Sequence, residues 1–389
     1  MPSTPARFDA PASIVHGGGA RQQLPELIQS LDARRPLIVT DAGVVKLGFV
    51  EEMRGMLDAA GLAVAVFTDV QADPTDANVD AGVAMLREHD ADIVIALGGG
   101  SPIDVAKVVA VRPRNEQPLR DYAGYHNIAN LGVPVVAIPT TAGTGSEATK
   151  VAVITDTQRQ VKMMMLAVPL MPRAAIVDYE LTLSMPRSLT AAVGVDTLTH
   201  GMEAYVSRKA SAMTDPLALS CIELVAGHLR RAWGDGADAE ARAAMSLAAC
   251  QGGLAFCNAS VCLVHGMSRP IGALFHVAHG LSNAVLLPTV TRFSIPGAVA
   301  RYATIARTVS AADAGDSDDE ACGRLIDWLE ALNRELELPA LRDCCGVDRE
   351  TFEQHLPKMA DDALASGSPG NNPRVPTRDE VIELYREAY

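Results

Sequence analysis

The sequence predicts an α/β domain with a parallel, Rossmann-like sheet in residues 1–185, followed by an all-helical domain in residues 186–389. Two observations predict this division. In the first half, short apolar runs of strand length alternate with helical patterns, which is typical of βαβ units in a doubly wound sheet. In the second half, only helical patterns follow one another. A chain of 389 residues is also long enough to form two hydrophobic cores.

The strands of the first domain are predicted from runs rich in Val, Ile and Leu. Buried strands are expected at residues 37–40, 64–67, 92–97 and 133–138. Helical patterns fall between them, at residues 50–60, 76–88 and 102–110. Short strands are further expected at residues 151–155, 161–166 and 175–178, and strands in this region are expected to form a side hairpin.

The helical domain is expected to begin near Pro186, because proline fits the first turn of a helix. Its helices are predicted at residues 188–206, 216–232, 239–257, 297–310, 320–335 and 379–387. Residues 311–319 and 366–376 are polar or rich in Pro and Gly, and predict loops. This half contains no convincing strand pattern.

The composition excludes several classes of partner. A net charge of -14 argues against binding to a nucleic-acid backbone, which requires a basic surface. The seven cysteines are irregularly spaced and do not indicate a disulfide framework. The N-terminal residues lack the basic-then-apolar pattern of a secretion signal, and no stretch approaches the ~20 apolar residues that cross a bilayer. These features predict a reduced, cytoplasmic protein without a nucleic-acid or membrane partner.

A run of small residues, Gly98, Gly99, Gly100 and Ser101, follows the strand expected at residues 92–97. Glycines let the backbone approach a ligand closely, and the helix that follows presents free N–H groups to an anion such as a pyrophosphate. The spacing differs from the G-x-G-x-x-G dinucleotide fingerprint. Taken alone, the run is explained about equally well by a tight turn.

A second loop of small residues follows the strand expected at residues 133–138 and carries the hydroxyls of Thr140, Thr141 and Thr144. These hydroxyls can bind phosphate, ribose or the nicotinamide amide, or they can satisfy the loop's own backbone. Two such loops at the carboxyl ends of strands in one sheet predict a ligand crevice. Asp41 ends another strand, where a carboxylate can accept from a ribose hydroxyl and repel a 2′-phosphate, which favours NAD over NADP. An aspartate that starts a turn is an equally good explanation of Asp41.

One carboxylate and three imidazoles form a candidate metal site, namely Asp196, His200, His265 and His279. Asp196 and His200 are four residues apart in a helical pattern and therefore share one helix face. His265 and His279 lie in an apolar stretch that also contains His276. Taken singly, each residue has an ordinary structural explanation, either a surface hydrogen bond or a buried core histidine. Together, imidazole nitrogen and carboxylate oxygen suit Fe²⁺ or Zn²⁺ better than Mg²⁺ or Ca²⁺.

These motifs resemble those of the iron-dependent (group III) alcohol dehydrogenases. The resemblance covers nearly the whole chain and runs through the segments GGGSPIDVAK, PTTAGTGSE, GVDTLTH and HGMSRPIGALFHVAHGLSNA. It implies a dinucleotide-binding domain and a metal-binding helical domain, with the active site in the cleft between them. It also implies a homodimer that uses NAD and Fe²⁺, or Zn²⁺, to interconvert a small primary alcohol, or a short hydroxy acid, and its oxo form. The implied metal ligands are Asp196, His200, His265 and His279, and the implied cofactor contacts are Asp41, Gly98, Gly99, Gly100, Ser101, Asp104, Thr140, Thr141, Thr144 and Lys162.

One position departs from the family's pattern. Many members carry another histidine four residues after the third ligand, thought to relay a proton, whereas this chain has Arg269. An arginine stays protonated and cannot act as a general base near neutral pH. We therefore consider two hypotheses: His276 or water held by the ribose hydroxyls relays the proton, or Arg269 pairs with an anionic substrate. A residue on a solvent-facing helix surface is the plain explanation of His276.

Other functions fit the same sequence less well. A lyase resembling dehydroquinate synthase shares the two-domain plan and pairs NAD with a metal, but it regenerates NAD within each cycle. A metal-independent reductase of unsaturated keto acids is conceivable within the family. A dinucleotide-binding scaffold without activity is disfavoured by the complete ligand set. Accumulation of NADH with short alcohols would distinguish the dehydrogenase from the lyase and from the inactive scaffold. Metal analysis would distinguish it from the metal-independent reductase.

Overall fold

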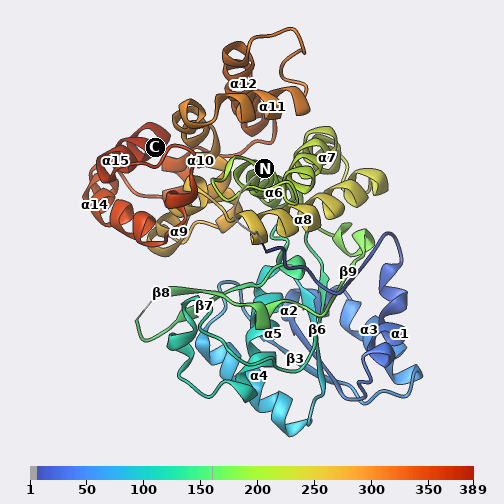
Figure 1. Cartoon of the computed structure of the whole chain (residues 1–389). Coiled ribbons are helices and arrows are strands. Elements are labelled where there is room, and N and C mark those ends of the chain that lie inside the picture. Colours follow the sequence, from blue (N-terminus) through green and yellow to red (C-terminus); the bar gives the residue numbers. More distant parts are fainter. Residues whose placement is uncertain (1–6, 160) are drawn as a thin grey trace. The chain divides into compact units, whose positions relative to one another are not determined.

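The computed structural model describes residues 7–159 and 161–389. The chain divides into two compact units, Asp9–Met185 and Pro186–Tyr389. The first unit holds all the strands of the described chain, and the second is built from helices (Figure 1).

The α/β unit is built on a six-stranded sheet in which all neighbouring strands are parallel, as predicted. The first expected strands begin and end within three residues of the observed ones, close to the usual uncertainty of element ends. In spatial order the strands are β1 (Ser13–His16), β9 (Ala174–Val177), β6 (Val135–Pro139), β4 (Ile93–Gly98), β2 (Pro36–Asp41) and β3 (Ala65–Val70).

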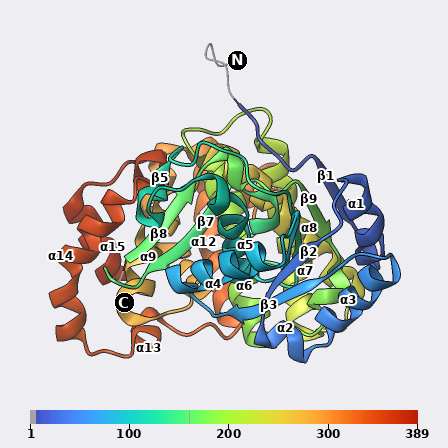
Figure 2. The same cartoon turned by 90° about the horizontal axis from the view of Figure 1, so that it is seen from below.

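Helices cover both faces of this sheet (Figure 2). Alternate residues of β2 point to opposite faces, so that Leu37 and Val39 belong to one hydrophobic cluster and Ile38 to another. The first cluster includes residues of α4 (Asp76–Glu88) and α5 (Gly100–Val111). The second includes residues of α1 (Leu24–Ser30) and α3 (Phe49–Ala59). Burial on both faces explains why the central strands are continuous apolar runs in the sequence.

The order of the strands brings three loops to one edge of the sheet. Strands β6, β4 and β2 are neighbours and run parallel, so their carboxyl ends lie side by side. The loop after β6 contains the threonines, the turn after β4 contains the glycine run, and Asp41 ends β2 before the short helix α2 (Ala42–Lys46). The candidate dinucleotide-binding residues are therefore gathered mainly by topology.

The predicted side hairpin is present. Strands β7 (Val151–Asp156) and β8 (Val161–Leu166) pair antiparallel, and the two-residue strand β5 (Gly124–Tyr125) adds to β8. The sequence did not predict β1, β5 or α1. Strands β1 and β5 are very short and lack buried residues, so they have no strong apolar pattern.

The second unit contains no strand in its described residues, as predicted. Six of its helices follow the predicted patterns: α6 (Arg187–Val206), α7 (Asp215–Gly234), α8 (Ala239–Ala259), α11 (Val299–Thr308), α12 (Asp318–Glu335) and α15 (Arg378–Ala388). The helices not predicted are α9 (Leu263–Phe275), α10 (His279–Ser294), α13 (Leu341–Cys345) and α14 (Arg349–Ala365). Three of these helices contain an internal proline, which disfavours a helix in a prediction from sequence. The prolines are Pro270 in α9, Pro288 in α10 and Pro357 in α14.

Helix α6 is the central element of this unit. It packs against α7, α8 and α10, and almost every residue from Gly194 to Val206 is buried. A helix that is buried all round belongs to a core rather than to a surface. Among the described residues, no single helix could cross a bilayer by length and composition; the pair α8 and α9 could do so only jointly, and it is bent by 103°.

Candidate functional site

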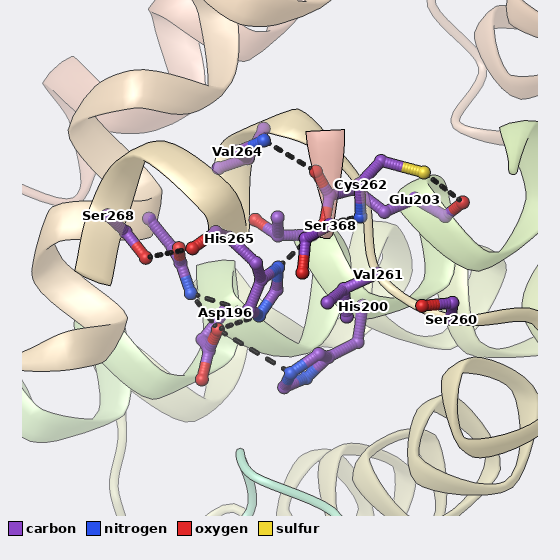
Figure 3. A network of polar contacts seen from close by, with 12 residues as sticks. Asp196, His200, Glu203, Ser260, Val261, Cys262, Val264, His265, Ser268 and Ser368 are labelled. Atoms are coloured by element: carbon purple, nitrogen blue, oxygen red, sulfur yellow. Dashed lines mark hydrogen bonds and ion pairs between the residues drawn. The ribbon is translucent and has the colours of Figure 1, made fainter. Parts of the chain in front are cut away.

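Three helices of the second unit bring the four candidate metal ligands together. Asp196 and His200 lie one turn apart on α6, His265 lies in the first turn of α9, and His279 is the first residue of α10. Asp196 Oδ1 lies 3.6 Å from His265 Nε2 and 3.9 Å from His200 Nε2 (Figure 3). One ligand atom each from Asp196, His265 and His279 lies within 4.8 Å of the other two. Spacing alone grouped only Asp196 with His200, and the approach of His265 and His279 to them follows from the packing of the three helices.

A close approach between two backbones makes the convergence possible. Gly280 follows His279 in the first turn of α10, and a Cβ at Gly280 would lie 2.8 Å from the carbonyl oxygen of Ala192 on α6. The same Cβ would lie 3.4 Å from Cβ of Asp196. Only glycine therefore lets α10 begin this close to α6, and the start of α10 carries His279.

Glu203 is a further residue of the site that the sequence analysis did not identify. Its Oε2 accepts from His265 Nδ1 at 2.7 Å and from the backbone N–H of Cys262 at 2.8 Å, and its Oε1 accepts from the N–H of Val264 at 2.6 Å (Figure 3). The carboxylate is buried and lies at the N-terminus of α9, where negative charge is stabilised. Its spacing was a usable signal, because Asp196, His200 and Glu203 lie on one face of α6.

Glu203 fixes the state of the His265 ring. Because Nδ1 carries the proton given to Glu203, Nε2 is the nitrogen that faces Asp196. Burial opposes a charge on His265, but the carboxylates of Glu203 and Asp196 outweigh it and raise the pKa of His265 to about 9. Burial also opposes the charge on Asp196, yet His200, His265 and His279 hold the pKa of its carboxyl well below the usual range. Asp196 is therefore an anion at neutral pH.

The donor set fits a transition-metal ion. One ionised carboxylate and the imidazoles of His265 and His279 offer ligand atoms within 4.8 Å of one another, and His200 Nε2 lies 3.9 Å from the same carboxylate. Carboxylate and hydrogen-bonded imidazole ligands suit Fe²⁺ or Zn²⁺. His200 and His265 stack with ring centroids 4.7 Å apart, and Phe256 stacks on His200 at 4.3 Å. These stacked rings restrict rotation of both imidazoles, which keeps the ligands in place.

The glycine turn of the α/β unit has the backbone that its sequence suggested. Gly98 has a φ of 151°, and a Cβ there would lie 2.6 Å from Cγ of Pro102. A Cβ on Gly99 would lie 3.5 Å from the Thr141 side chain, and one on Gly100 would lie 3.0 Å from Thr144. The two predicted ligand loops therefore lie in contact, and a side chain at Gly98 or Gly100 would crowd Pro102 or Thr144.

Other residues expected to contact the cofactor have partners within the unit. Asp41 caps α2, because its Oδ1 accepts from the N–H groups of Gly43 at 2.7 Å and Val44 at 3.0 Å. Lys162 lies on the side hairpin and pairs with Asp73 at 2.6 Å. Ser101 and Thr140 lie in the first turn of α5 and at the end of β6. Their roles toward a dinucleotide stay predictions.

Asp104 belongs to a polar network that anchors the threonine loop. Its Oδ1 accepts from Ser146 Oγ at 2.7 Å and its Oδ2 from the N–H of Val153 at 2.9 Å. The fully buried ammonium of Lys107 donates to Ser146 Oγ at 2.8 Å, Thr149 Oγ1 at 3.2 Å and the carbonyl of Val151 at 2.8 Å. Burial raises the pKa of Asp104, and the Lys107 charge opposes that rise. Both oxygens of Asp104 therefore tie α5 to the loop and to β7. The cofactor contact that the family resemblance implies for Asp104 stays a prediction.

The two candidate proton-transfer residues lie at different places on α9. Arg269 is half-buried, and its Nη1 donates to Ser368 Oγ at 3.1 Å. His276 is exposed and ends the helix with a φ of 56°. Their catalytic roles stay predictions.

The comparisons with known proteins agree over the whole chain. The family model described as "Iron-containing alcohol dehydrogenase" matches residues 11–179, and that described as "Fe-containing alcohol dehydrogenase family, C-terminal" matches residues 190–389. An NAD-dependent methanol dehydrogenase of Bacillus methanolicus is 37% identical, over 98% of this chain and 99% of that protein. An NADPH-dependent butanol dehydrogenase of Clostridium saccharobutylicum is 35% identical, over 98% of each. The crystal structure of a 1,3-propanediol oxidoreductase is 36% identical and has a TM-score of 0.96, over 99% of this chain and 100% of that one.

We expect Glu203→Gln to weaken the binding of Zn²⁺ by about 10–100-fold, the usual effect of losing a partner of a ligating histidine. Three donors face the two oxygens of Glu203, and a glutamine replaces one oxygen by a competing donor. Competition with a chelating dye measures the affinity. The exposed Glu223→Gln on α7 is the matched control. Equal affinities of Glu203→Gln and the control would show that Glu203 only caps α9.

We expect Lys107→Met to lower the free energy of unfolding by ~3–5 kcal/mol, because it leaves the Asp104 carboxylate without its cation. The loss should be larger at about pH 8 than at about pH 5. Without Lys107 the pKa of Asp104 rises further, and a carboxyl with a raised folded-state pKa loses stability as the pH increases through that pKa. Urea unfolding at the two pH values measures this, with the exposed Lys46→Met as control. A pH-independent loss would contradict the ionic role of the pair.

Proposed function

Because the chain belongs to the iron-containing alcohol dehydrogenase family, we propose that this oxidoreductase transfers a hydride between NAD(H) and a small primary alcohol or aldehyde, using a divalent metal. The observation that carries the proposal is the convergence of Asp196, His200, His265 and His279 from three helices. Fe²⁺ is the proposed ion, and Zn²⁺ fits the same donors.

The proposed metal ligands would supply a buried site that carries the negative charge of Asp196. A bound divalent ion would act as a Lewis acid that polarises a carbonyl or lowers the pKa of an alcohol. Asp196 contributes one full negative charge, and the contact with Glu203 orients the His265 ring so that Nε2 faces the same centre. The buried position of Asp196, His200 and His265 excludes water from most of the ligand shell. Electrostatic interactions are stronger in such surroundings than in water.

The α/β unit supplies the site for the nicotinamide cofactor, which carries the hydride chemistry. The proposed phosphate site is the N-terminus of α5 at the glycine turn, where free N–H groups favour an anion. The network of Lys107, Asp104 and Ser146 holds the threonine loop beside this turn. NAD is proposed over NADP, because the carboxylate of Asp41 at the end of β2 would repel a 2′-phosphate.

Short alcohols and aldehydes are the proposed substrates. The names of the similar proteins support this class, since they act on methanol, butanol and 1,3-propanediol. A steady rise of NADH absorbance with such alcohols would separate the proposal from a lyase that regenerates NAD in every cycle. Parallel titrations with NAD and NADP would measure the cofactor preference.

We expect His265→Ala to lose the metal and the activity together while the protein still binds NAD. The reason is that His265 belongs to the helical unit, whereas the proposed dinucleotide residues all lie in the α/β unit. Metal analysis of the purified protein, NADH formation and fluorescence titration with NADH measure the three properties. His228→Ala on α7, whose ring contacts the carbonyl of Leu224, is the control. Turnover by metal-free protein would refute the proposed function.

We expect Arg269→His to add a titration near the usual imidazole pKa of about 6.5 to the pH profile of kcat, because this substitution restores a proton-transfer group. Arg269→Ala should lack that titration. Steady-state rates across the pH range measure the profiles. If both variants keep the activity and the profile of the unchanged protein, position 269 takes no part in proton transfer or in substrate binding.

A further inference from the structure

Asn283 is fully buried in the middle of the candidate metal site and has no role in the sequence analysis. It lies on α10, one turn after His279, so both side chains face α6 and α9. Its Nδ2 donates to Asp196 Oδ1 at 2.7 Å and lies 3.2 Å from both His265 Nε2 and His279 Nε2. One amide nitrogen thus contacts three of the four candidate ligands, each from a different helix.

The orientation of this amide is set by Asp196. If the amide were reversed, its oxygen would lie where the nitrogen lies, and two acceptors would face each other at 2.7 Å. Within the part of the chain that the structure describes, the Asn283 Oδ1 atom is buried and has no hydrogen-bond partner. An unsatisfied buried carbonyl is costly. The hydrogen bond from Nδ2 to Asp196 therefore stabilises this orientation by more than the unpaired Oδ1 atom destabilises it. A side chain that served only to pack the core would not need an amide at this position.

The Nε2 atoms of His265 and His279 and the carboxylate oxygen of Asp196 differ in whether they can bind a cation while they contact the Asn283 amide. A neutral imidazole has one lone pair on Nε2, so a cation bound by His265 or His279 takes the place of the amide contact. A carboxylate oxygen has a further lone pair and can accept from Asn283 while a cation is bound. The hydrogen bond to Asp196 is therefore the contact of Asn283 that is compatible with an occupied site.

We propose that Asn283 is a positioning residue of the metal site, which holds the Asp196 carboxylate with one oxygen directed toward His200, His265 and His279. This inference rests on the proposed function, because it concerns the same metal. Asn283 restrains the orientation of the Asp196 carboxylate, the one anionic residue among the four candidate ligands. Glu203 restrains the orientation of the His265 ring in the same way. A carboxylate without this restraint can rotate and bind a cation through both oxygens, which changes the number of ligand atoms.

The test uses Co²⁺, whose visible absorption depends on the number and geometry of its ligands. We expect Asn283→Ala to weaken Co²⁺ binding to the full-length protein by about 10–100-fold and to change the shape and intensity of the visible bands. The control is Asn372→Ala, which removes another buried asparagine of the same unit, one that donates to Ser294 and to the carbonyl of Arg374. The control should keep the affinity and the spectrum.

A second variant covers the case in which Asn283→Ala does not fold. Asn283→Asp keeps the shape of the side chain but places a second carboxyl beside Asp196. Like charges at this distance repel, and a divalent cation relieves the repulsion. The rise in Tm on adding Zn²⁺ should therefore be larger for Asn283→Asp than for the unchanged protein.

The outcomes are distinguishable. An unchanged Co²⁺ spectrum and affinity in folded Asn283→Ala, or an equal Zn²⁺-induced rise in Tm for Asn283→Asp, would overturn the role of Asn283 and leave the proposed function intact. If the unchanged protein itself binds neither Co²⁺ nor Zn²⁺, the proposed function fails, and the role of Asn283 fails with it. Altered bands, with the control unaffected, would support the inference.

Discussion

The helical unit depends on two buried carboxylates of α6. Asp196 and Glu203 are almost inaccessible to water, and a buried charge is tolerated only when it is paired and hydrogen-bonded. Both find their partners on α9 and α10: backbone N–H groups, imidazoles and one amide. The position of α9 and α10 against α6 is therefore specified by polar contacts as well as by packing. The same contacts direct the imidazoles of His265 and His279 inward, so the stability of this region and the geometry of the site have one cause.

The α/β unit uses a comparable arrangement for a different purpose. Lys107 and Asp104 on α5 reach Ser146, Thr149 and the main chain of β7. The loop after β6 has no regular secondary structure over most of its length, so its conformation needs such fixed partners. In both units, charged groups inside the protein hold irregular or terminal segments next to a candidate ligand site. The regular elements supply the scaffold, and the buried polar groups define where the side chains of the site point.

Much of the fold could be predicted because it follows from local patterns. The central strands of the sheet are buried on both faces and are continuous apolar runs, and α4 was predicted with its observed ends, Asp76–Glu88. Helices α9, α10 and α14 were not predicted, since their internal prolines disrupt the helical pattern. Of the candidate site, residue types and spacing gave Asp196, His200, His265 and His279. Glu203 was missed although it shares a face of α6 with Asp196 and His200, because its partners lie on α9. Asn283 was missed because an amide near a histidine has no distinctive pattern until α6, α9 and α10 are packed together. The hydrogen bonds of Asp104 likewise depend on a loop and a strand about 40–50 residues away.

The close contact of Gly280 with the main chain of Ala192 limits how this centre can change. Side chains around a ligand can be exchanged one at a time, but the separation of two backbones in contact cannot be widened without displacing a whole helix. Directed evolution of the enzyme toward a larger ion or a bulkier coordination shell would have to find compensating shifts along α10. Variation of the surrounding loops and apolar side chains leaves that separation untouched, and it is the more accessible route to new substrates on this scaffold.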